Sequence, residues 1–254
     1  MIVLAGGAAR HPSYLGDLAG IPGQRATPHL RGVGDSPAPA TPEAGSYWNQ
    51  AADIETLRKH LGLPTLTLIA HSAGTRLAIA YAAQYPDRVN RMLLITPPAG
   101  YLVTVPSDAD EISAHRRGEP AFDTAVAALS TMPQPGASDD EFATWQETTA
   151  PAGYAAWTEK EQAHAKTGRW YPAAVFAYFS VTPPHDLPDR LSELHVPVRI
   201  IAGAQDHLTG LAPVLAMTKL FPRGEAVVLD ECGHYPWVEQ PTAFRQVAED
   251  FLTN

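Results

Sequence analysis

The 254-residue sequence contains a single cysteine, Cys232, so no disulfide can form within the chain. This suits a reducing compartment. Cys232 lies two residues before His234, which would suit a reactive thiol. Free cysteines are more often small, buried core residues, and we expect Cys232 to be one.

Long apolar runs are also absent. No stretch approaches the roughly 20 consecutive apolar residues that span a bilayer. The apolar N-terminus has neither a basic leader nor a small-residue cleavage site. We therefore expect a soluble, cytoplasmic protein with no membrane partner.

Basic residues are few, with 18 Lys and Arg against 27 Asp and Glu and a net charge of −9. Nucleic acid would repel such a chain unless it carried a basic patch. The basic clusters Arg116-Arg117 and 58–60 are typical of solvated helix faces. Phosphate-binding glycine loops and Cys or His pairs at metal-ligand spacing are missing too. We expect no cofactor, no metal and no nucleic-acid partner, but a small-molecule or peptide substrate; the oligomeric state stays open.

What the sequence does contain is a serine between a buried strand and a helix. Residues 66–69 are mostly apolar, Ala70-His71-Ser72-Ala73-Gly74 follows, and apolar residues then recur at helical spacing. A nucleophile at such a turn needs small residues two places before and after it, and Ala70 and Gly74 meet that need. The helix N-terminus favours anionic intermediates at Ser72. The alternative is an ordinary serine N-cap.

A nucleophilic serine needs a general base and an acid that orients it. Residues 196–203 are typical of a buried strand, and Asp206 follows in the next loop. Residues 226–229 form another short apolar run, and His234 comes soon after it. Asp206 is the candidate acid and His234 the candidate base. An Asp after a strand is often only a turn former, and His207, beside the acid, is an alternative base.

An oxyanion hole is the third requirement. The first residues resemble a buried strand that opens into the loop Ala5-Gly6-Gly7-Ala8-Ala9. We expect the backbone N–H groups of Gly7 and Ala73 to hold the oxyanion. A plain Gly-Gly turn is the alternative.

Together these motifs resemble the α/β-hydrolase superfamily, and more narrowly its proline iminopeptidase-like branch (serine peptidase S33-type). Ser72, Asp206 and His234 occur in the same order along the chain as the catalytic residues of that family. The resemblance extends to Leu30-Arg31-Gly32-Val33-Gly34-Asp35-Ser36 and to segments 52–62, 85–89 and 232–237. It covers residues 1 to about 96 and about 191 to 254. It implies a Ser-His-Asp mechanism through an acyl-enzyme.

Two departures from the branch bear on the substrate. Where the branch has His-Gly-Gly-Pro-Gly, this chain has residues 5–9, which keep only the two central glycines. Iminopeptidases hold the substrate ammonium with cap glutamates, one of them before a Tyr-Phe pair. Here segment 172–179 contains no acid. A desolvated ammonium without a carboxylate is costly, so strict iminopeptidase activity is disfavoured unless another acid takes over, such as Glu147, Glu159 or Glu161.

The rest of the sequence predicts a mostly parallel, about six-stranded sheet. Strands are expected at 2–5, weakly at 24–28, and at 65–69 and 91–96, with helices at about 48–61 and 73–84. The usual first two strands of the fold would be lacking. Segment 24–28 would then lie at the sheet edge, where its charge and proline oppose further pairing.

Residues 97–190 lack strand signals and are predicted to form an inserted helical cap, or lid, over a hydrolase core of residues 1–96 and 191–254. Helix starts are expected at Ser107, Ser138 and Thr158, the last two as capping boxes. A cap over the strand ends would close a pocket and exclude water. The residues expected to line this pocket are Trp157, Phe176, Tyr178 and Trp237.

The sequence thus predicts a serine hydrolase that cleaves a peptide or amide bond in a sizeable, largely apolar substrate. An ester or thioester is the near alternative, because the same site cleaves all three. Two further hypotheses are a tailoring enzyme of natural-product (peptide antibiotic) biosynthesis that uses the same triad, and a non-catalytic ligand-binding relative. Epoxide hydrolysis of the usual kind is disfavoured, because it needs an Asp in place of Ser72.

Overall fold

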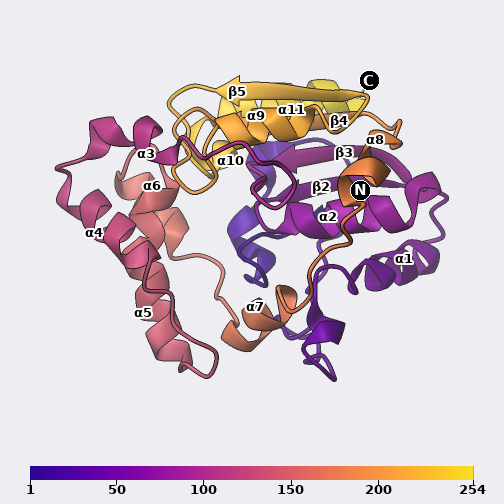
Figure 1. Cartoon of the computed structure of the whole chain (residues 1–254), viewed down its shortest axis with the longest axis horizontal. Helices are drawn as coiled ribbons and strands as arrows, with labels where there is room; N and C mark the ends of the chain where they lie inside the picture. Colours follow the sequence, from indigo (N-terminus) through magenta and orange to yellow (C-terminus); the bar gives the residue numbers. More distant parts are fainter. Residues whose placement is uncertain (254) are drawn as a thin grey trace.

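The computed structural model describes residues 1–253 and is built around a parallel sheet, as predicted. Within these residues the sheet has five strands in the order β1-β2-β3-β4-β5 (Figure 1). Their bounds are β1 (Ile2–Leu4), β2 (Leu66–His71), β3 (Val89–Ile95), β4 (Val198–Gly203) and β5 (Gly224–Leu229). Because all strands are parallel, their carboxyl ends meet at one edge, where open α/β sheets bind ligands.

The expected strand at 24–28 lies where it was predicted, at the sheet edge beside β1, but it forms only one bridge. Ile2 pairs with Ala26 in parallel. Val3 N–H donates to Ala26 O and Ala26 N–H to Met1 O, each at 2.9 Å. Pro28, two residues on, has no N–H to continue such a ladder. The regular sheet therefore has five strands, not about six.

Side chains alternate between the two faces of the sheet along each strand. Helices cover both faces. One face, with Leu68 and Met92, packs against α1 (Ala51–His60), α2 (Gly74–Gln84), α8 (Leu187–Ser192) and α9 (Ala212–Thr218). The other, with Ile69 and Leu93, packs against α10 (Pro236–Glu239) and α11 (Pro241–Thr253). Figure 1 shows α1 and α2 on one side of the sheet and α11 on the other.

The segment between β3 and β4 is helical. It contains α3 (Ala109–Ile112), α4 (Pro120–Leu129), α5 (Asp139–Thr149), α6 (Glu159–Ala165) and α7 (Pro172–Tyr178). The capping boxes predicted at Ser138 and Thr158 are present. At the third expected start, Ser107 Oγ accepts a hydrogen bond from Ala109 N at 3.3 Å, and α3 is only one turn long. Figure 1 shows α3–α6 grouped beyond one end of the sheet.

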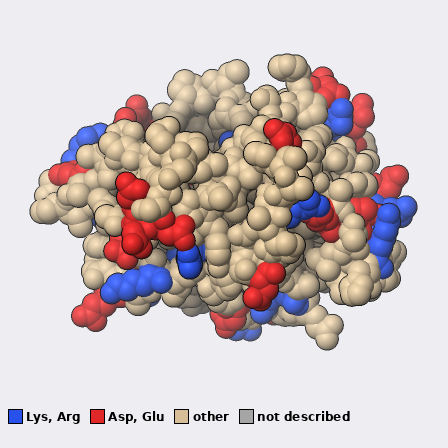
Figure 2. All heavy atoms as spheres, turned by 90° about the horizontal axis from the view of Figure 1, so that it is seen from below, with Lys and Arg blue, Asp and Glu red and all other residues tan. Residues whose placement is uncertain are grey.

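Two properties of the surface bear on partners. None of the helices in residues 1–253 is both long enough and apolar enough to cross a membrane. On the face that Figure 2 shows, basic side chains lie among acidic ones and form no continuous basic patch.

Candidate active site

Ser72 lies on a sharp turn between β2 and α2, as the sequence predicted. Its φ is +50°, in the left-handed region that a residue with a side chain rarely adopts. Ser72 N–H donates to Ile95 O at 2.8 Å, and the hydroxyl of Thr75 donates to Ser72 O at 2.6 Å. Such a conformation costs about 1–3 kcal/mol and persists where the surroundings fix it. The turn is therefore held under strain, as at many reactive sites.

Close backbone approaches explain the small residues around Ser72. A Cβ on Gly74 would lie 2.5 Å from Ala5 O and 2.6 Å from Leu4 O. A Cβ on Gly6 would lie 2.8 Å from the Cβ of Ser72. The end of β1 therefore passes directly beside the serine turn, which places the loop of residues 5–9 next to Ser72.

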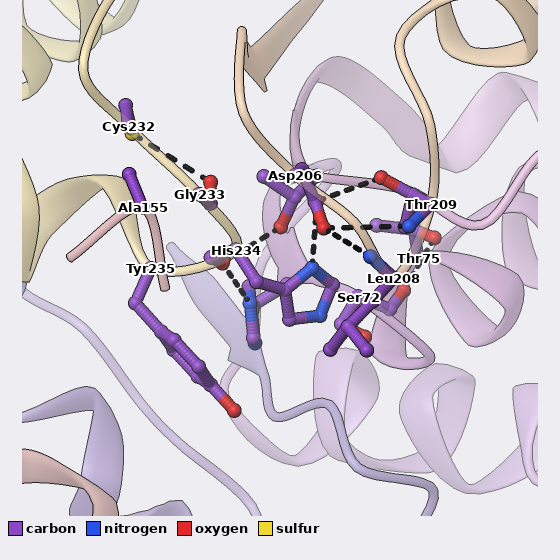
Figure 3. A network of polar contacts seen from close by, with 12 residues as sticks. Ser72, Thr75, Ala155, Asp206, Leu208, Thr209, Cys232, Gly233, His234 and Tyr235 are labelled. Atoms are coloured by element: carbon purple, nitrogen blue, oxygen red, sulfur yellow. Dashed lines mark hydrogen bonds and ion pairs between the residues drawn. The ribbon is translucent and has the colours of Figure 1, made fainter. Parts of the chain in front are cut away.

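Asp206 and His234 meet in the structure (Figure 3). His234 Nδ1 lies 2.8 Å from Asp206 Oδ2. Asp206 is 1% exposed and also accepts hydrogen bonds from Leu208 N at 2.9 Å and from the hydroxyl of Thr209 at 2.7 Å. Burial alone would raise the pKa of Asp206, but His234 and these donors hold it below its usual value. An ionised Asp206 keeps the proton of His234 on Nδ1 and leaves Nε2 as the basic nitrogen.

The geometry separates the two candidate bases. His234 and Ser72 line the same pocket. Figure 3 shows the ring of His234 turned to Asp206. His207, the alternative, contacts Ser113 Oγ at 2.8 Å and packs on the ring of Phe122. Its ring makes no hydrogen bond to Asp206 within residues 1–253. His234 is therefore the histidine that Asp206 orients.

A buried hydrogen-bonded chain behind the site was not predicted from the sequence. Gly6 N–H donates to Tyr14 Oη at 2.6 Å, and Tyr14 Oη lies 2.7 Å from His71 Nδ1. His71 Nε2 lies 2.9 Å from the carbonyl oxygen of His234. Because that carbonyl can only accept, His71 carries its proton on Nε2, and Tyr14 donates to Nδ1. Burial lowers the pKa of His71 well below its usual value, which keeps the ring neutral. This chain of hydrogen bonds links the loop of residues 5–9 to the main chain of His234.

The partly buried carboxylate of Glu239 fixes the loop that carries His234 from the other side. Glu239 accepts hydrogen bonds from Ala155 N at 2.6 Å, Gly233 N at 3.0 Å and Tyr235 N at 3.3 Å. Burial raises the pKa of Glu239 to about 7, against the effect of these donors. His234 N–H also donates to Gly153 O at 2.8 Å. Residues 153–155 of the helical segment are thus bonded directly to the loop that carries His234.

The two expected oxyanion donors face no internal acceptor. Gly7 lines the pocket with a φ of +64°, and Ala73 is the N-cap of α2. Within residues 1–253, neither amide donates a hydrogen bond. The neighbouring N–H of Gly6 is not free, because Tyr14 accepts from it. The amides of Gly7 and Ala73 are therefore available to a ligand.

The pocket beside Ser72 has a volume of about 140 Å³ and is lined by aromatic and apolar groups with few charges. The sheet domain contributes Gly7, Arg10, Tyr14, His71, Ser72, Leu208, His234 and Tyr235. The segment between β3 and β4 contributes Leu129, Trp145, Gln146, Thr149, Ala150, Gly153, Tyr154, Ala165 and Trp170. No Asp or Glu is among these residues.

The four aromatic residues expected to line the pocket lie elsewhere, and this expectation needs correction. Trp157 packs on the ring of Tyr154, and Phe176 packs on that of Phe142. Trp237 lies behind His71, with ring centroids 4.8 Å apart, and is 6% exposed. Tyr178 is fully buried and donates to Ala73 O at 2.8 Å. Tyr178 and Trp237 are core residues, whereas Trp157 and Phe176 are partly buried against other aromatic rings.

Arg10 and Tyr14 are among the pocket residues that the sequence interpretation missed. Both follow the Gly6-Gly7 loop closely. A charged residue directly after a loop of small apolar residues was an available signal for Arg10. Cys232, in contrast, behaves as expected of a core residue: it is fully buried, and burial raises the pKa of its thiol.

The parallel sheet, the strained serine turn and the Asp–His pair together define a hydrolase of the serine type. A model of the alpha/beta hydrolase fold family matches residues 26–241, so the chain belongs to this family.

Known relatives agree with this placement. The chain is 27% identical over 217 residues to the AB hydrolase superfamily protein YclE of Bacillus subtilis, across 79% of this chain and 73% of that protein. It is 24% identical over 239 residues to a probable proline iminopeptidase of Leptolyngbya boryana, across 80% of this chain and 70% of that protein. The predicted resemblance to the iminopeptidase-like branch is thereby confirmed.

An esterase from Exiguobacterium antarcticum has a similar structure. Its TM-score is 0.74 at 17% identity, with 100% of this chain and 91% of that chain covered. At this identity the likeness concerns the fold alone.

Proposed function

We propose that this protein hydrolyses a small carboxylic ester through an acyl-enzyme on Ser72. The observation that carries the proposal is the 2.8 Å contact between Asp206 and His234 at the edge of the pocket that Ser72 also lines. A serine hydroxyl is a poor nucleophile near pH 7 unless a base of this kind accepts its proton.

In the proposed mechanism, Ser72 Oγ attacks the substrate carbonyl carbon while its proton passes to His234 Nε2. Asp206 stabilises the imidazolium that forms. The carbonyl oxygen becomes an oxyanion and accepts hydrogen bonds from the amides of Gly7 and Ala73. His234 then gives its proton to the leaving alkoxide, and the acyl group stays on Ser72. Water attacks this ester in the same way, which releases the acid and restores the hydroxyl of Ser72.

We further propose that residues 97–190 act as a cap on a core made of residues 1–96 and 191–254. Support comes from Trp145, Tyr154 and Trp170, which line the pocket from this segment, and from the bond between Gly153 and His234. A volume of about 140 Å³ suits a compact acyl group. The sizeable substrate expected from the sequence would require the cap helices to move.

Amide hydrolysis is the second candidate, because the same groups attack amides and a probable proline iminopeptidase is among the relatives. The residues that line the pocket argue against an activity that removes a free N-terminal proline. None of Glu147, Glu159 and Glu161 lines it. Glu161 is occupied by its capping box with Thr158 and by an ion pair with Lys160 at 3.2 Å. An ammonium group would find no carboxylate there.

The test is hydrolysis of 4-nitrophenyl butyrate and of proline 4-nitroanilide by the wild type, Ser72→Ala and Ser192→Ala. Ser192 is an exposed serine at the end of α8 and serves as the matched control. We expect ester turnover by the wild type and the control, a loss of about 10³-fold or more in Ser72→Ala, and little proline release. Ester hydrolysis that survives in Ser72→Ala would refute the proposal. No turnover of any ester, amide or thioester would favour the non-catalytic alternative.

A further inference from the structure

Arg10 is a buried positive charge in the wall of the pocket, and it has no carboxylate partner. It is 4% exposed. Its Nε donates to Gly168 O at 3.0 Å and its Nη1 to Tyr235 Oη at 3.2 Å. Its Nη2 donates to Thr167 O and, at 3.5 Å, to Ala165 O. All these partners are neutral, and Arg10 forms no ion pair within residues 1–253.

The surroundings compensate this charge only in part. A buried ion costs several kcal/mol unless it is paired. The guanidinium carbon lies 4.3 Å from the centroid of the Tyr14 ring, close enough for a cation–π contact. A guanidinium has five N–H groups, and the four contacts above leave one N–H on Nη1 without an acceptor. Arg10 therefore retains both charge and donor capacity for a ligand.

No nearby acid supplies the missing partner. Arg10 is the only Lys or Arg that lines the pocket, and no Asp or Glu lines it. The carboxylates of Asp206, Glu161 and Glu239 are occupied by His234, by Thr158 and by three backbone amides, respectively. The pocket therefore has a positive charge with no negative charge to oppose it.

A second unsatisfied donor belongs to the same pocket. The indole Nε1 of Trp170, which is buried, has no hydrogen-bond partner. Trp170 lines the pocket and pairs with Arg10 in an antiparallel bridge. Buried donors without acceptors are rare in proteins, because each costs about 1–3 kcal/mol. Both unsatisfied donors would be met by an acceptor-rich anionic ligand.

We propose that Arg10 binds a carboxylate carried by the acyl part of the substrate, so that the enzyme prefers monoesters of short dicarboxylic acids. The proposal rests on the proposed function of Ser72. Arg10 follows Gly7 by three residues, and its N–H donates to Gly6 O at 3.3 Å, so the charge belongs to the loop that holds the expected oxyanion donor. A charge-assisted bond from guanidinium to carboxylate is stronger than a bond between neutral groups. The same charge repels a substrate ammonium.

The test compares 4-nitrophenyl hydrogen glutarate, which carries a free carboxylate, with neutral 4-nitrophenyl pentanoate. Wild type, Arg10→Gln, Arg10→Lys and Arg169→Gln are measured with both esters. Arg169→Gln is the matched control, because it removes one positive charge from an exposed side chain between Gly168 and Trp170, outside the pocket. For the wild type and the control we expect kcat/KM to favour the glutarate ester by about tenfold or more.

In Arg10→Gln this preference should disappear, mainly through KM for the glutarate ester, so that the ratio of kcat/KM for the two esters falls to about one, while the lost hydrogen bonds to Gly168 and Thr167 affect both esters alike. Arg10→Lys should keep part of the preference, because it keeps the charge and loses only the planar fork. A wild type that prefers the pentanoate ester, or an Arg10→Gln variant with an unchanged ratio, would overturn the proposal. A purely structural role for Arg10 would lower both rates alike and leave the ratio unchanged.

A binding measurement separates this proposal from the proposed function. Glutarate should raise the melting temperature of Ser72→Ala, and pentanamide should not. The double variant Ser72→Ala/Arg10→Gln should lose the glutarate effect. Such binding without ester turnover would refute the proposed function and support the anion site. Ester turnover without any effect of glutarate on the melting temperature would support the proposed function and refute the anion site.

Discussion

At the scale of single residues, the proposed chemistry depends on which ring nitrogen of each histidine carries the proton. Asp206 fixes the proton of His234 on Nδ1, and Tyr14 and the carbonyl of His234 fix that of His71 on Nε2. The two histidines therefore hold opposite tautomers, which one buried partner sets for His234 and two set for His71. His234 is left with a basic nitrogen on the side of the pocket, whereas His71 has both nitrogens occupied and can only position its neighbours.

Asp206→Asn should lower kcat for ester hydrolysis by about 10³- to 10⁴-fold, because an amide can also stabilise the wrong tautomer of the base. KM should change little, since Asp206 does not line the pocket. Steady-state kinetics with 4-nitrophenyl butyrate measure this, with circular dichroism as the check on folding. A variant that retains a tenth of the wild-type kcat would argue against Asp206 as the orienting acid.

Tyr14→Phe should destabilise the fold by about 1–3 kcal/mol, because it leaves the amide of Gly6 and Nδ1 of His71 buried without partners. The ring stays, so no cavity forms. Tyr85→Phe is the control: the Tyr85 hydroxyl makes no hydrogen bond within residues 1–253, and its loss should change stability by less than about 0.5 kcal/mol. Urea unfolding measures both. Equal stability of the two variants would show that the buried chain contributes little.

At the scale of elements, the site depends on how closely the end of β1 passes the turn between β2 and α2. Strand and helix periodicity predicted both elements and the position of Ser72. Gly74 and Ala70 were predictable as well, because the turn requires small residues. Periodicity could not predict the residues that the loop after β1 brings in, such as Arg10 and Tyr14. Their positions depend on three consecutive left-handed residues, Gly7, Ala8 and Ala9, two of which are not glycine.

Gly74→Ala should destabilise the protein by about 1–3 kcal/mol and reduce activity, because its Cβ would strike the backbone carbonyls of Leu4 and Ala5 at 2.5–2.6 Å. Gly100→Ala is the matched control, since nothing lies within 4 Å of its Cβ position and its φ is not left-handed. Thermal unfolding and ester hydrolysis are compared for the two variants. If both melt like the wild type, the close approach of β1 to the turn is not a constraint.

At the scale of the whole molecule, the helical segment and the sheet meet over the pocket through hydrogen bonds of Arg10, Glu239 and the half-buried His164 of α6. His164 Nε2 lies 2.8 Å from Tyr14 O, and its Nδ1 lies 2.7 Å from the hydroxyl of Tyr154. The order of strands and the helical segment could be predicted from the sequence. The face that each cap helix turns to the pocket could not, because helices of 4–11 residues carry too few positions to define it.

The contribution of His164 to the free energy of unfolding should fall as the pH drops from about 6.5 to about 4, whereas Glu239, whose pKa burial raises to about 7, acts in the opposite direction. Burial lowers the pKa of His164 from 6.5 to about 4, so in this range the unfolded chain binds a proton that the folded chain does not. His71 acts in the same direction. The part due to His164 is at most about 3 kcal/mol, fully present above pH 6.5 and lost on acidification. Relative to the wild type, His164→Gln should gain stability in urea unfolding as the pH falls through this range, whereas His60→Gln, at an exposed residue, should follow the wild type. A dependence that His164→Gln leaves unchanged would place the acid sensitivity elsewhere.

The central claim is that Ser72 is a nucleophile activated by His234. Its most direct test is mass spectrometry of the peptide that carries the adduct after reaction with a fluorophosphonate. We expect one adduct in the wild type, on Ser72, and a much slower reaction in His234→Ala. An adduct on another residue, or equal labelling of the wild type and Ser72→Ala, would contradict it.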